Sequence, residues 1–423
     1  MDIFERLESD VRSYSRAWPT VFHEAHGEFL IDESGAEYID FFSGAGTLNY
    51  GHNDPAMKRR LIEYIEADGV MHGLDMSTTA KRQFLERLES TILRPRGLDY
   101  KVQFPGPTGT NAIEAALKLA RKATGREPIY GFANAFHGMT LGAMAVGGNL
   151  QRRSAPGVRP NDTPPLPYED SPAANGASLD EIEATLRQAY REQRAPAAII
   201  VETVQGEGGL HTASNDWLRR LASICATQQV LLIVDDVQAG CGRTGTFFSF
   251  EPAQIVPDIV CLSKSISGYG LPLALTLFKR ELDVWDPGEH SGTFRGNNAA
   301  FVTGAEALRF WETDEFARAV DAKASRISTF LIDLAEGHEA ARGTPRGRGL
   351  FQGIHLAVPG LAQAVCQLAY DRGLLMETSG PDNDVVKMLP PLTIGDDALD
   401  RGLAILEESL IAALEAAPPG ATA

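Results

Sequence analysis

Residues 230–264 read VLLIVDDVQAGCGRTGTFFSFEPAQIVPDIVCLSK and contain two apolar runs that each end in charged or polar residues. The run 230–234 ends in an acidic pair that begins with Asp235, and the run 259–262 ends in a serine followed by Lys264. Such runs predict two strands buried on both faces of a parallel sheet. Because ligands of open α/β sheets bind beyond the carboxyl ends of the strands, we expect the acid and the amine at one site.

Strands and helices alternate on both sides of this stretch. Residues 101–104 (KVQF) precede a Gly-rich turn and a helix that ends at Gly125, and residues 197–202 (AAIIVE) precede a helix expected at 215–227. This alternation predicts an α/β fold, in which a mostly parallel sheet carries helices on both faces. Three further helices are expected at 55–68, 78–93 and 179–193.

A smaller α+β unit is expected from the two ends of the chain. Apolar residues around a Gly turn at 29–42 indicate a hairpin, and a Gly/Arg turn at 342–349 (RGTPRGRG) separates a helix-rich stretch from a strand at 350–356. A helix at 361–372 and strands near 374 and 386 complete this unit. The expected division is therefore 1–54 (arm and hairpin, part of the small domain), 55–305 (large cofactor-binding domain) and 306–423 (C-terminal part of the small domain).

Charge and hydropathy indicate which binding partners and which cellular location to expect for this protein. The 423 residues include 39 basic and 56 acidic side chains, a net charge of −17, so we expect neither nucleic acid nor an anionic membrane as a partner. The first residues, MDIFERLESDVRSYSR, lack the apolar core of a secretory leader, and no apolar run approaches the roughly 18 residues of a membrane span. A cytosolic location is expected.

Metal and disulfide sites are not expected. The four cysteines lie far apart with no CxxC spacing, which favours reduced thiols. His23 and His26 are three residues apart, but no further ligands follow in a recognisable pattern.

Asp235 and Lys264 together suit a cationic aromatic cofactor that a lysine binds as a Schiff base, which points to pyridoxal phosphate. At about 4 Å and an effective dielectric near 20, a carboxylate beside the pyridine nitrogen contributes roughly 4 kcal/mol, or about three pKa units, in favour of the protonated ring. Burial would lower the pKa of the lysine, as imine formation requires. Taken alone, Asp235 could instead cap a helix or form a structural ion pair. Lys264 alone could instead be a solvated lysine at the end of a strand.

Residues 107–111 (PTGTN) lie between a strand and a long helix and could hold a phosphate. Backbone N–H groups, threonine hydroxyls and the helix dipole all favour an anion there. Neither the Gly-Lys-Ser/Thr of a P-loop nor the GxGxxG spacing of a dinucleotide fold is present, so a nicotinamide dehydrogenase is the weaker alternative. Phe136 and His137 follow another strand, where an aromatic ring could stack on the cofactor.

Eight motifs, in this order, resemble the class III (ω-amino-acid) aminotransferases of pyridoxal-phosphate fold type I: GAGTLNYGHNDP, TGTNAIEAALKLARK, FHGMTLGA, VETVQGEGG, VDDVQAGCGRTG, LSKSISG, GTFRGN and RGRGLFQGI. The resemblance implies a sheet of the seven-stranded type and an active unit that is a homodimer or higher homo-oligomer with shared sites. It implies that Lys264 binds the cofactor covalently, Asp235 binds its ring nitrogen and Gln238 its ring hydroxyl. It also implies that Thr293 reaches the phosphate in the neighbouring subunit. The full set of expected cofactor-binding residues is Thr108, Gly109, Thr110, Phe136, His137, Glu202, Asp235, Gln238, Lys264 and Thr293.

The resemblance further assigns two residues to the substrates, which are small amino and keto acids. Arg346 matches the arginine that receives the α-carboxylate of glutamate or 2-oxoglutarate, and Glu207 matches the glutamate that neutralises it. We therefore expect an ion pair between them that opens for one substrate and stays closed for the other.

Departures from the commoner family pattern, at Asp236 and at residues 106–108 (GPT), resemble one subgroup of the family. This likeness implies transfer of an amine from glutamate to aspartate 4-semialdehyde, which gives L-2,4-diaminobutyrate in the first step of ectoine biosynthesis. Ornithine, acetylornithine or 4-aminobutyrate are the alternative substrates. A lyase or aminomutase on the same fold, and a catalytically silent binding protein, are alternatives of other classes.

Overall fold

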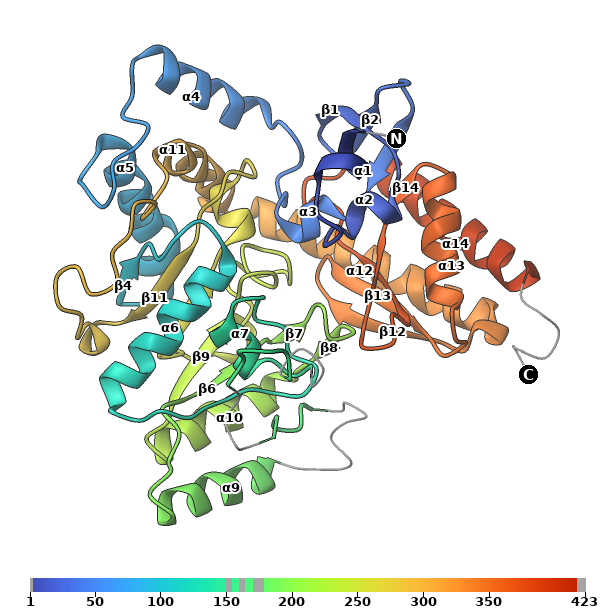
Figure 1. Cartoon of the computed structure of the whole chain (residues 1–423). Helices are drawn as coiled ribbons and strands as arrows, with labels where there is room; N and C mark the ends of the chain where they lie inside the picture. The colour runs from blue at the N-terminus through green and yellow to red at the C-terminus, as the bar shows by residue number, and fades with distance from the viewer. Residues whose placement is uncertain (1–2, 150–153, 160–163, 170–178, 417–423) are drawn as a thin grey trace.

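The computed structural model describes residues 3–149, 154–159, 164–169 and 179–416. These residues form two halves that lie side by side, one built around a six-stranded sheet and the other around two four-stranded sheets (Figure 1). A short ribbon of β7 (Val204–Gln205) and β8 (His211–Thr212) lies near the boundary between the halves. The described α-helices are α1 (Ile3–Leu7), α2 (Tyr14–Ala17), α3 (Ser43–Gly46), α4 (Pro55–Glu66), α5 (Thr79–Arg87), α6 (Gly109–Thr124), α7 (Leu141–Val146), α9 (Leu179–Arg191), α10 (Asn215–Thr227), α11 (Asn298–Ala307), α12 (Glu315–Gly337), α13 (Leu361–Asp371) and α14 (Asp396–Ala416).

The large sheet confirms the predicted mostly parallel arrangement. Its strand order is β4 (Tyr100–Gln103), β11 (Leu275–Lys279), β10 (Ile259–Leu262), β9 (Leu231–Asp235), β6 (Ala198–Val201) and β5 (Ile129–Tyr130). Only β11, which the sequence analysis did not foresee, runs antiparallel to its two neighbours. Six strands are assigned, and an isolated parallel bridge between Phe132 and Leu166 follows β5.

The strands of this sheet are buried on both faces, which explains their uninterrupted apolar runs. Alternate residues of one strand enter different core clusters: Leu232 and Val234 of β9 belong to the cluster that includes residues of α5 and α10, whereas Ile233 belongs to the cluster that includes residues of α6 and α7. Side chains of a strand point to opposite faces in turn, so both faces need an apolar residue. The charged residues can therefore begin only where the strand ends, at Asp235.

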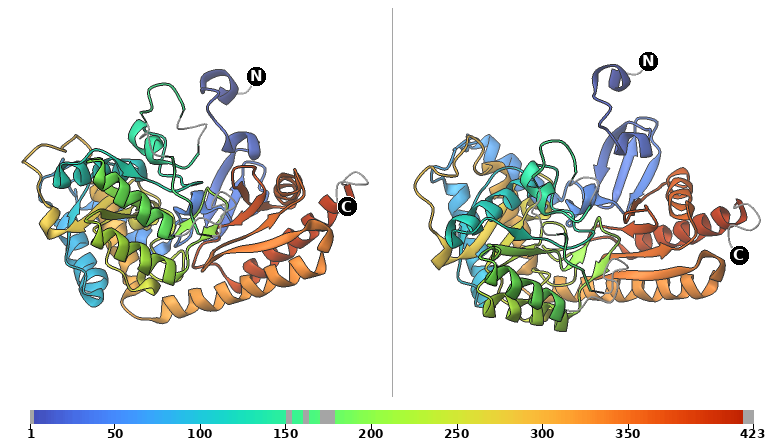
Figure 2. Two further views of the ribbon diagram at one scale, coloured as in Figure 1. Left: turned by 90° about the horizontal axis from the view of Figure 1, so that it is seen from below. Right: turned by 60° about the horizontal axis from the view of Figure 1, so that its bottom comes forward.

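The smaller half joins the two ends of the chain. One sheet has the order β1 (Phe22–His26), β2 (Phe29–Asp32), β3 (Glu37–Asp40), β14 (Leu374–Leu375), and the other β12 (Gly343–Arg348), β13 (Phe351–Leu356), β16 (Val385–Met388), β15 (Glu377–Ser379). Parallel pairing of β3 with β14 places the N-terminal hairpin in a sheet with a C-terminal strand. The long helix α12 leads from the large half along the small one (Figure 2). The domain boundaries at residues 55 and 305 stay a prediction.

One element differs in kind from its prediction. Residues 342–349 were expected to be a Gly/Arg turn, but 343–348 form strand β12, which pairs antiparallel with β13. The glycines misled the prediction because Gly347 adopts a φ of +92° within the strand, and a Cβ there would lie 2.0 Å from the carbonyl oxygen of Phe351. Gly347 is thus required by a close backbone contact inside a strand.

Candidate active site

A cavity of about 140 Å³ lies beyond the carboxyl ends of β9 and β10 and gathers most of the predicted cofactor residues. All of them line it except Thr108 and Thr293. The lining residues are Gly109, Thr110, Phe136, His137, Gly138, Glu202, Val204, Glu207, Asp235, Val237, Gln238, Ala239 and Lys264. Val204, Val237 and Ala239 were not predicted, because small apolar residues carry no chemical signal of their own in a sequence.

Asp235, the last residue of β9, is held in the cavity wall by two hydrogen bonds. Its Oδ2 lies 2.7 Å from Nδ1 of His137, and its Oδ1 accepts a bond of 3.1 Å from the backbone N–H of Val237. The His137 side chain is wholly buried, and its Nε2 has no hydrogen-bond partner among the described residues. A buried carboxylate with two fixed donors is oriented before any ligand arrives.

Lys264 begins the short 3₁₀ turn that follows β10 and has a φ of +53°, a left-handed conformation that is strained for a lysine. Its Nζ donates a hydrogen bond of 3.0 Å to the carbonyl oxygen of Ala45. Burial lowers the pKa of Lys264, with nearby Glu207 acting in the opposite direction. A lowered pKa increases the fraction of neutral, nucleophilic amine.

The short element α3, at the start of the motif GAGTLNYGHNDP, is a left-handed turn at residues 43–46 and has no regular α-helical backbone. Ser43, Gly44 and Ala45 all have φ between +49° and +57°. The turn directs the carbonyl oxygen of Ala45 to Lys264 and also to Nε2 of Gln238, which donates a bond of 2.9 Å. The loop therefore contributes a backbone acceptor to the site, a role that no side-chain motif could reveal.

The start of α6 forms the opposite end of the cavity. Thr108 is the N-cap residue, and its N–H and hydroxyl both bond Oδ1 of Asn111, so its side chain is turned to the helix and not to the cavity. A Cβ at Gly109 would lie 2.7 Å from the side chain of Val237, and one at Gly138 would lie 2.4 Å from Thr110 Oγ1. Glycine at these two positions thus lets the backbones of three loops meet around the helix N-terminus.

Two more buried acids, Glu202 in the cavity wall and Asp236, lie near Asp235. Glu202 accepts a 3.0 Å bond from the N–H of Phe136, and burial, with Asp235 nearby, raises its pKa well above the usual range. Burial also raises the pKa of Asp236 to about 7. Asp236 Oδ2 accepts a bond from the Ser249 N–H, and its Oδ1 has no hydrogen-bond partner in the part of the chain that is described.

Replacing Asp236 with Asn should flatten the pH dependence of stability. Between about pH 4, where the unfolded carboxyl titrates, and about pH 7, the native protein binds the extra proton, so wild-type stability falls as pH rises. Asn cannot lose a proton. As pH rises, the free energy of unfolding of the variant should therefore not show the decrease of up to about 4 kcal/mol that Asp236 causes in wild type. Urea unfolding at pH 4.5 and 8 measures the difference. Exposed Asp216 provides the control, Asp216→Asn, and equal pH slopes in wild type and D236N would contradict the prediction.

Glu207 lines the cavity but does not pair with the predicted arginine. Within the described part of the chain its ion pair is with Lys387, whose Nζ lies 2.7 Å from Oε1. Burial would raise the pKa of Glu207, but Lys387 and Lys264 outweigh it and lower the pKa to about 2. Arg346 instead donates a 3.0 Å bond to the carbonyl oxygen of Gly209. The expected Glu207–Arg346 pair is therefore corrected to Glu207–Lys387.

Strand register explains this correction. Across the second small sheet Arg346 is opposite Gly353, Gly353 is opposite Lys387, and Lys387 is opposite Glu377. Arg346 and Lys387 thus lie two strands, or about 10 Å, apart in one row. Lys387 is wholly buried, and its second carboxylate neighbour is Glu377 at 2.9 Å. Sequence reasoning missed Lys387 because a lysine in a short strand ordinarily faces solvent.

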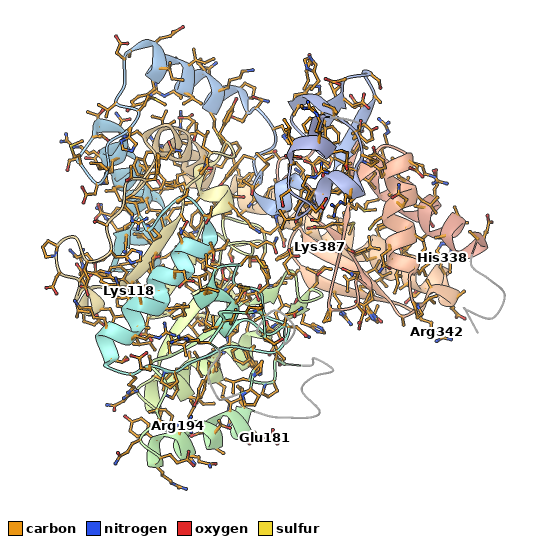
Figure 3. The ribbon with its side chains drawn as sticks, in the orientation of Figure 1. Lys118, Glu181, Arg194, His338, Arg342 and Lys387 are labelled. Atoms are coloured by element: carbon orange, nitrogen blue, oxygen red, sulfur yellow. The ribbon has the colours of Figure 1, made fainter. Side chains whose placement is uncertain are left out.

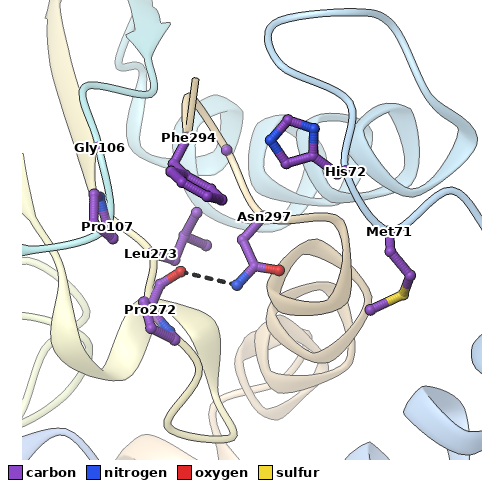
Figure 4. A pocket seen from close by; sticks show the side chains of 9 residues that line it. Met71, His72, Gly106, Pro107, Pro272, Leu273, Phe294 and Asn297 are labelled. Carbon is purple, nitrogen blue, oxygen red and sulfur yellow. Dashed lines mark hydrogen bonds between the residues drawn. The ribbon is translucent and has the colours of Figure 1, made fainter. Parts of the chain in front are cut away.

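Thr293, like Thr108, is a predicted cofactor residue that does not line the cavity. It is exposed, next to Phe294, in the segment before α11. Phe294 lines a separate, mostly apolar hollow of about 390 Å³ with Met71, His72 and Leu273 (Figure 4).

The fold and the cavity define an α/β protein with a buried acid and a lysine at adjacent strand ends. The chain belongs to the class III aminotransferase family, whose model matches residues 12–410. It is 55% identical over 415 residues, 98% of this chain and 97% of the relative, to a diaminobutyrate–2-oxoglutarate transaminase of Halalkalibacterium halodurans. It is 59% identical to a protein of the same name from Nocardia farcinica, over 96% of this chain and 93% of the relative.

Solved structures share the fold. An ornithine aminotransferase of Toxoplasma gondii superposes with a TM-score of 0.83 at 24% identity, covering 97% of this chain and 94% of that one. Among the described residues, no helix is long and apolar enough to cross a bilayer, and no three His, Cys, Asp or Glu side chains gather as a metal site would require.

Proposed function

We propose that this aminotransferase moves an amine from glutamate to aspartate 4-semialdehyde, giving 2-oxoglutarate and L-2,4-diaminobutyrate, the first step of ectoine biosynthesis. The observation that carries the proposal is the 52–59% identity, over nearly the whole chain, to transaminases named for diaminobutyrate and 2-oxoglutarate. A cytosolic location also stays a prediction.

The cavity fits pyridoxal phosphate, the cofactor of this family. Because Gly109 and Gly138 have no side chains, a ligand group can approach the start of α6. The buried Nε2 of His137 has no hydrogen-bond partner among the described residues. When bound, the cofactor supplies a cationic ring that stabilises the carbanion formed during amine transfer. Asp235, held by His137 and by a backbone N–H, would keep the ring nitrogen protonated. Gly109 and Thr110 would hold the phosphate, Phe136 would stack on the ring, and Gln238 would bind the ring hydroxyl.

Lys264 would act twice. Its buried amine has a lowered pKa and can bind the cofactor covalently. When Nζ is not bound to the cofactor, it would hold and move the proton at the substrate carbon. The carbonyl oxygen of Ala45, at 3.0 Å, would hold Nζ between these steps.

We assign the carboxylate of the α-amino donor to Lys387. Glu207 separates this buried cation from the cavity, since it lines the cavity and contacts Nζ at 2.7 Å. When Glu207 pairs with Lys387 the cation is masked, which suits a substrate that presents its distal amine. When Glu207 turns away, the cation can receive an α-carboxylate. Arg346, about 10 Å further along the row, would serve the more distant carboxylate.

We infer that the active unit contains at least two copies of this chain. The loops around Met71 and Phe294 expose large apolar side chains, with Met71 51% and Phe294 63% exposed, over the hollow of Figure 4. Large exposed apolar side chains gathered around a hollow favour a protein partner. Thr293 is exposed and directly precedes Phe294, and it would complete the phosphate site of a second copy.

Product analysis tests the proposed reaction. Holoenzyme given glutamate and aspartate 4-semialdehyde should form L-2,4-diaminobutyrate and 2-oxoglutarate in equal amounts, with ping-pong kinetics because each half reaction releases a product before the other begins. L-2,4-Diaminobutyrate should also be the best amine donor in the reverse direction. A clear preference for ornithine, acetylornithine or 4-aminobutyrate would assign the chain to another substrate, and turnover without a keto acid would point to a lyase or mutase.

A further inference from the structure

Glu377 is a second carboxylate on Lys387 for which the mechanism above has no use. The two residues are directly opposite each other in the antiparallel pair β15–β16, with Nζ and Oε1 2.9 Å apart. Glu207 Oε1 contacts the same ammonium group at 2.7 Å. One wholly buried lysine thus has two acids, close to the boundary between the halves (Figure 3).

This cluster of Glu207, Lys387 and Glu377 carries an excess negative charge. Glu377 Oε1 is buried and receives no hydrogen bond of normal geometry from any described residue, although it is near Nζ. Burial raises the pKa of Glu377, and Lys387 only partly opposes this. The carboxylate is therefore incompletely compensated, and a further cation or N–H donor would stabilise it.

The cluster lies beside the reacting amine. Glu207 belongs to the cavity wall, and the charges of Glu207, Lys387 and Glu377 all act on Lys264. The same three charges act on Tyr14 of α2, so the cluster also lies near the N-terminal arm. A substrate whose amine is at Lys264 would place its other end within reach of this wall.

We propose that Glu377 selects substrates that carry an α-ammonium group next to their far carboxylate. The inference rests on the proposed function, because L-2,4-diaminobutyrate and aspartate 4-semialdehyde carry such a group. 4-Aminobutyrate is the same molecule as diaminobutyrate without it. The α-ammonium would donate to Glu377 and supply the positive charge that the cluster lacks, whereas 4-aminobutyrate would meet an uncompensated carboxylate.

The experiment compares Glu377→Gln with wild type as holoenzymes in single half reactions, followed by the change in cofactor absorbance. The ratio of the second-order rate constants for L-2,4-diaminobutyrate and 4-aminobutyrate should fall about 10- to 100-fold, the usual effect of one hydrogen bond to a charged group. The rate constant for glutamate should stay the same or rise, because Lys387 loses a competing carboxylate. Glu37→Gln, which removes a more exposed acid paired with Arg401, is the charge-matched control.

The outcomes separate this inference from the proposed function. Equal slowing of both donors would show that Glu377 only supports Lys387, and an unchanged ratio would also overturn the inference while leaving the reaction in place. Wild type that does not accept diaminobutyrate would overturn both. Should the Gln variant fail to fold, Glu377→Asp provides the test. Asp keeps the negative charge but places it one methylene further from the substrate. The ratio of the rate constants for L-2,4-diaminobutyrate and 4-aminobutyrate should then fall by a smaller factor than in Glu377→Gln.

Discussion

Lys264→Ala should lower the rate of amine transfer at least about 1,000-fold and abolish the near-visible absorbance of the lysine-bound cofactor. The variant loses both the covalent attachment and the Nζ that carries the proton, and positioned proton transfer alone contributes about 10² to 10⁴ in rate. Stopped-flow half reactions with glutamate and absorbance spectra of the reconstituted protein give both readouts.

Two comparisons sharpen this test. Lys101→Ala, which removes an exposed lysine of β4, should leave rate and spectrum unchanged. A small primary amine in the buffer should partly restore the rate of Lys264→Ala, because the cavity left by the missing side chain can admit a soluble proton carrier. Full turnover by Lys264→Ala without added amine would refute the assignment of the lysine.

Lys387→Met should destabilise the protein by about 3–5 kcal/mol at neutral pH, because it leaves Glu207 and Glu377 buried without their cation. In wild type the pKa of Glu207 is about 2, so this group adds stability above about pH 4.5 that is lost as pH falls towards 2. In the variant both carboxyls should have raised pKa values, so their protonation should add a further increase in stability as pH falls.

Urea unfolding at pH 5 and pH 8 measures the difference: wild type loses stability over this interval through Asp236, and Lys387→Met should lose more. Lys387→Arg keeps the charge and should retain the wild-type dependence on pH, although its larger, planar head group changes the contacts. If Lys387→Met had wild-type stability at pH 8, the two carboxylates would have found other partners, and the assignment of Lys387 as their shared cation would be wrong.

The chemistry of the site could be predicted from the sequence because it depends on strand ends. Asp235 and Lys264 stand where apolar runs stop, and a strand buried on both faces shows its end clearly. The helix at 215–227 was likewise confirmed to the residue, since Ser214 caps it and apolar residues repeat at helical spacing.

Contacts across strands could not be predicted in this way. The row that places Glu377 opposite Lys387 is set by register, which local sequence does not specify. For the same reason the partner of Glu207 was expected to be Arg346, which lies in the same row but two strands from Lys387. The antiparallel β11 also escaped notice, although its sequence LTLFK contains three buried apolar residues and resembles the runs that predicted β9 and β10.

The two sheets that supply the site differ in how well they tolerate amino-acid substitutions. Strands β9 and β10 have no solvent face, so nearly any substitution there disturbs one of two packed cores. In the second small sheet one face covers an apolar core and the other presents Arg346, Lys387 and Glu377 in a single row. New substrate preferences can thus evolve by exchanging side chains along that row, while the residues that carry the bond-making steps stay fixed on strands that tolerate little mutation.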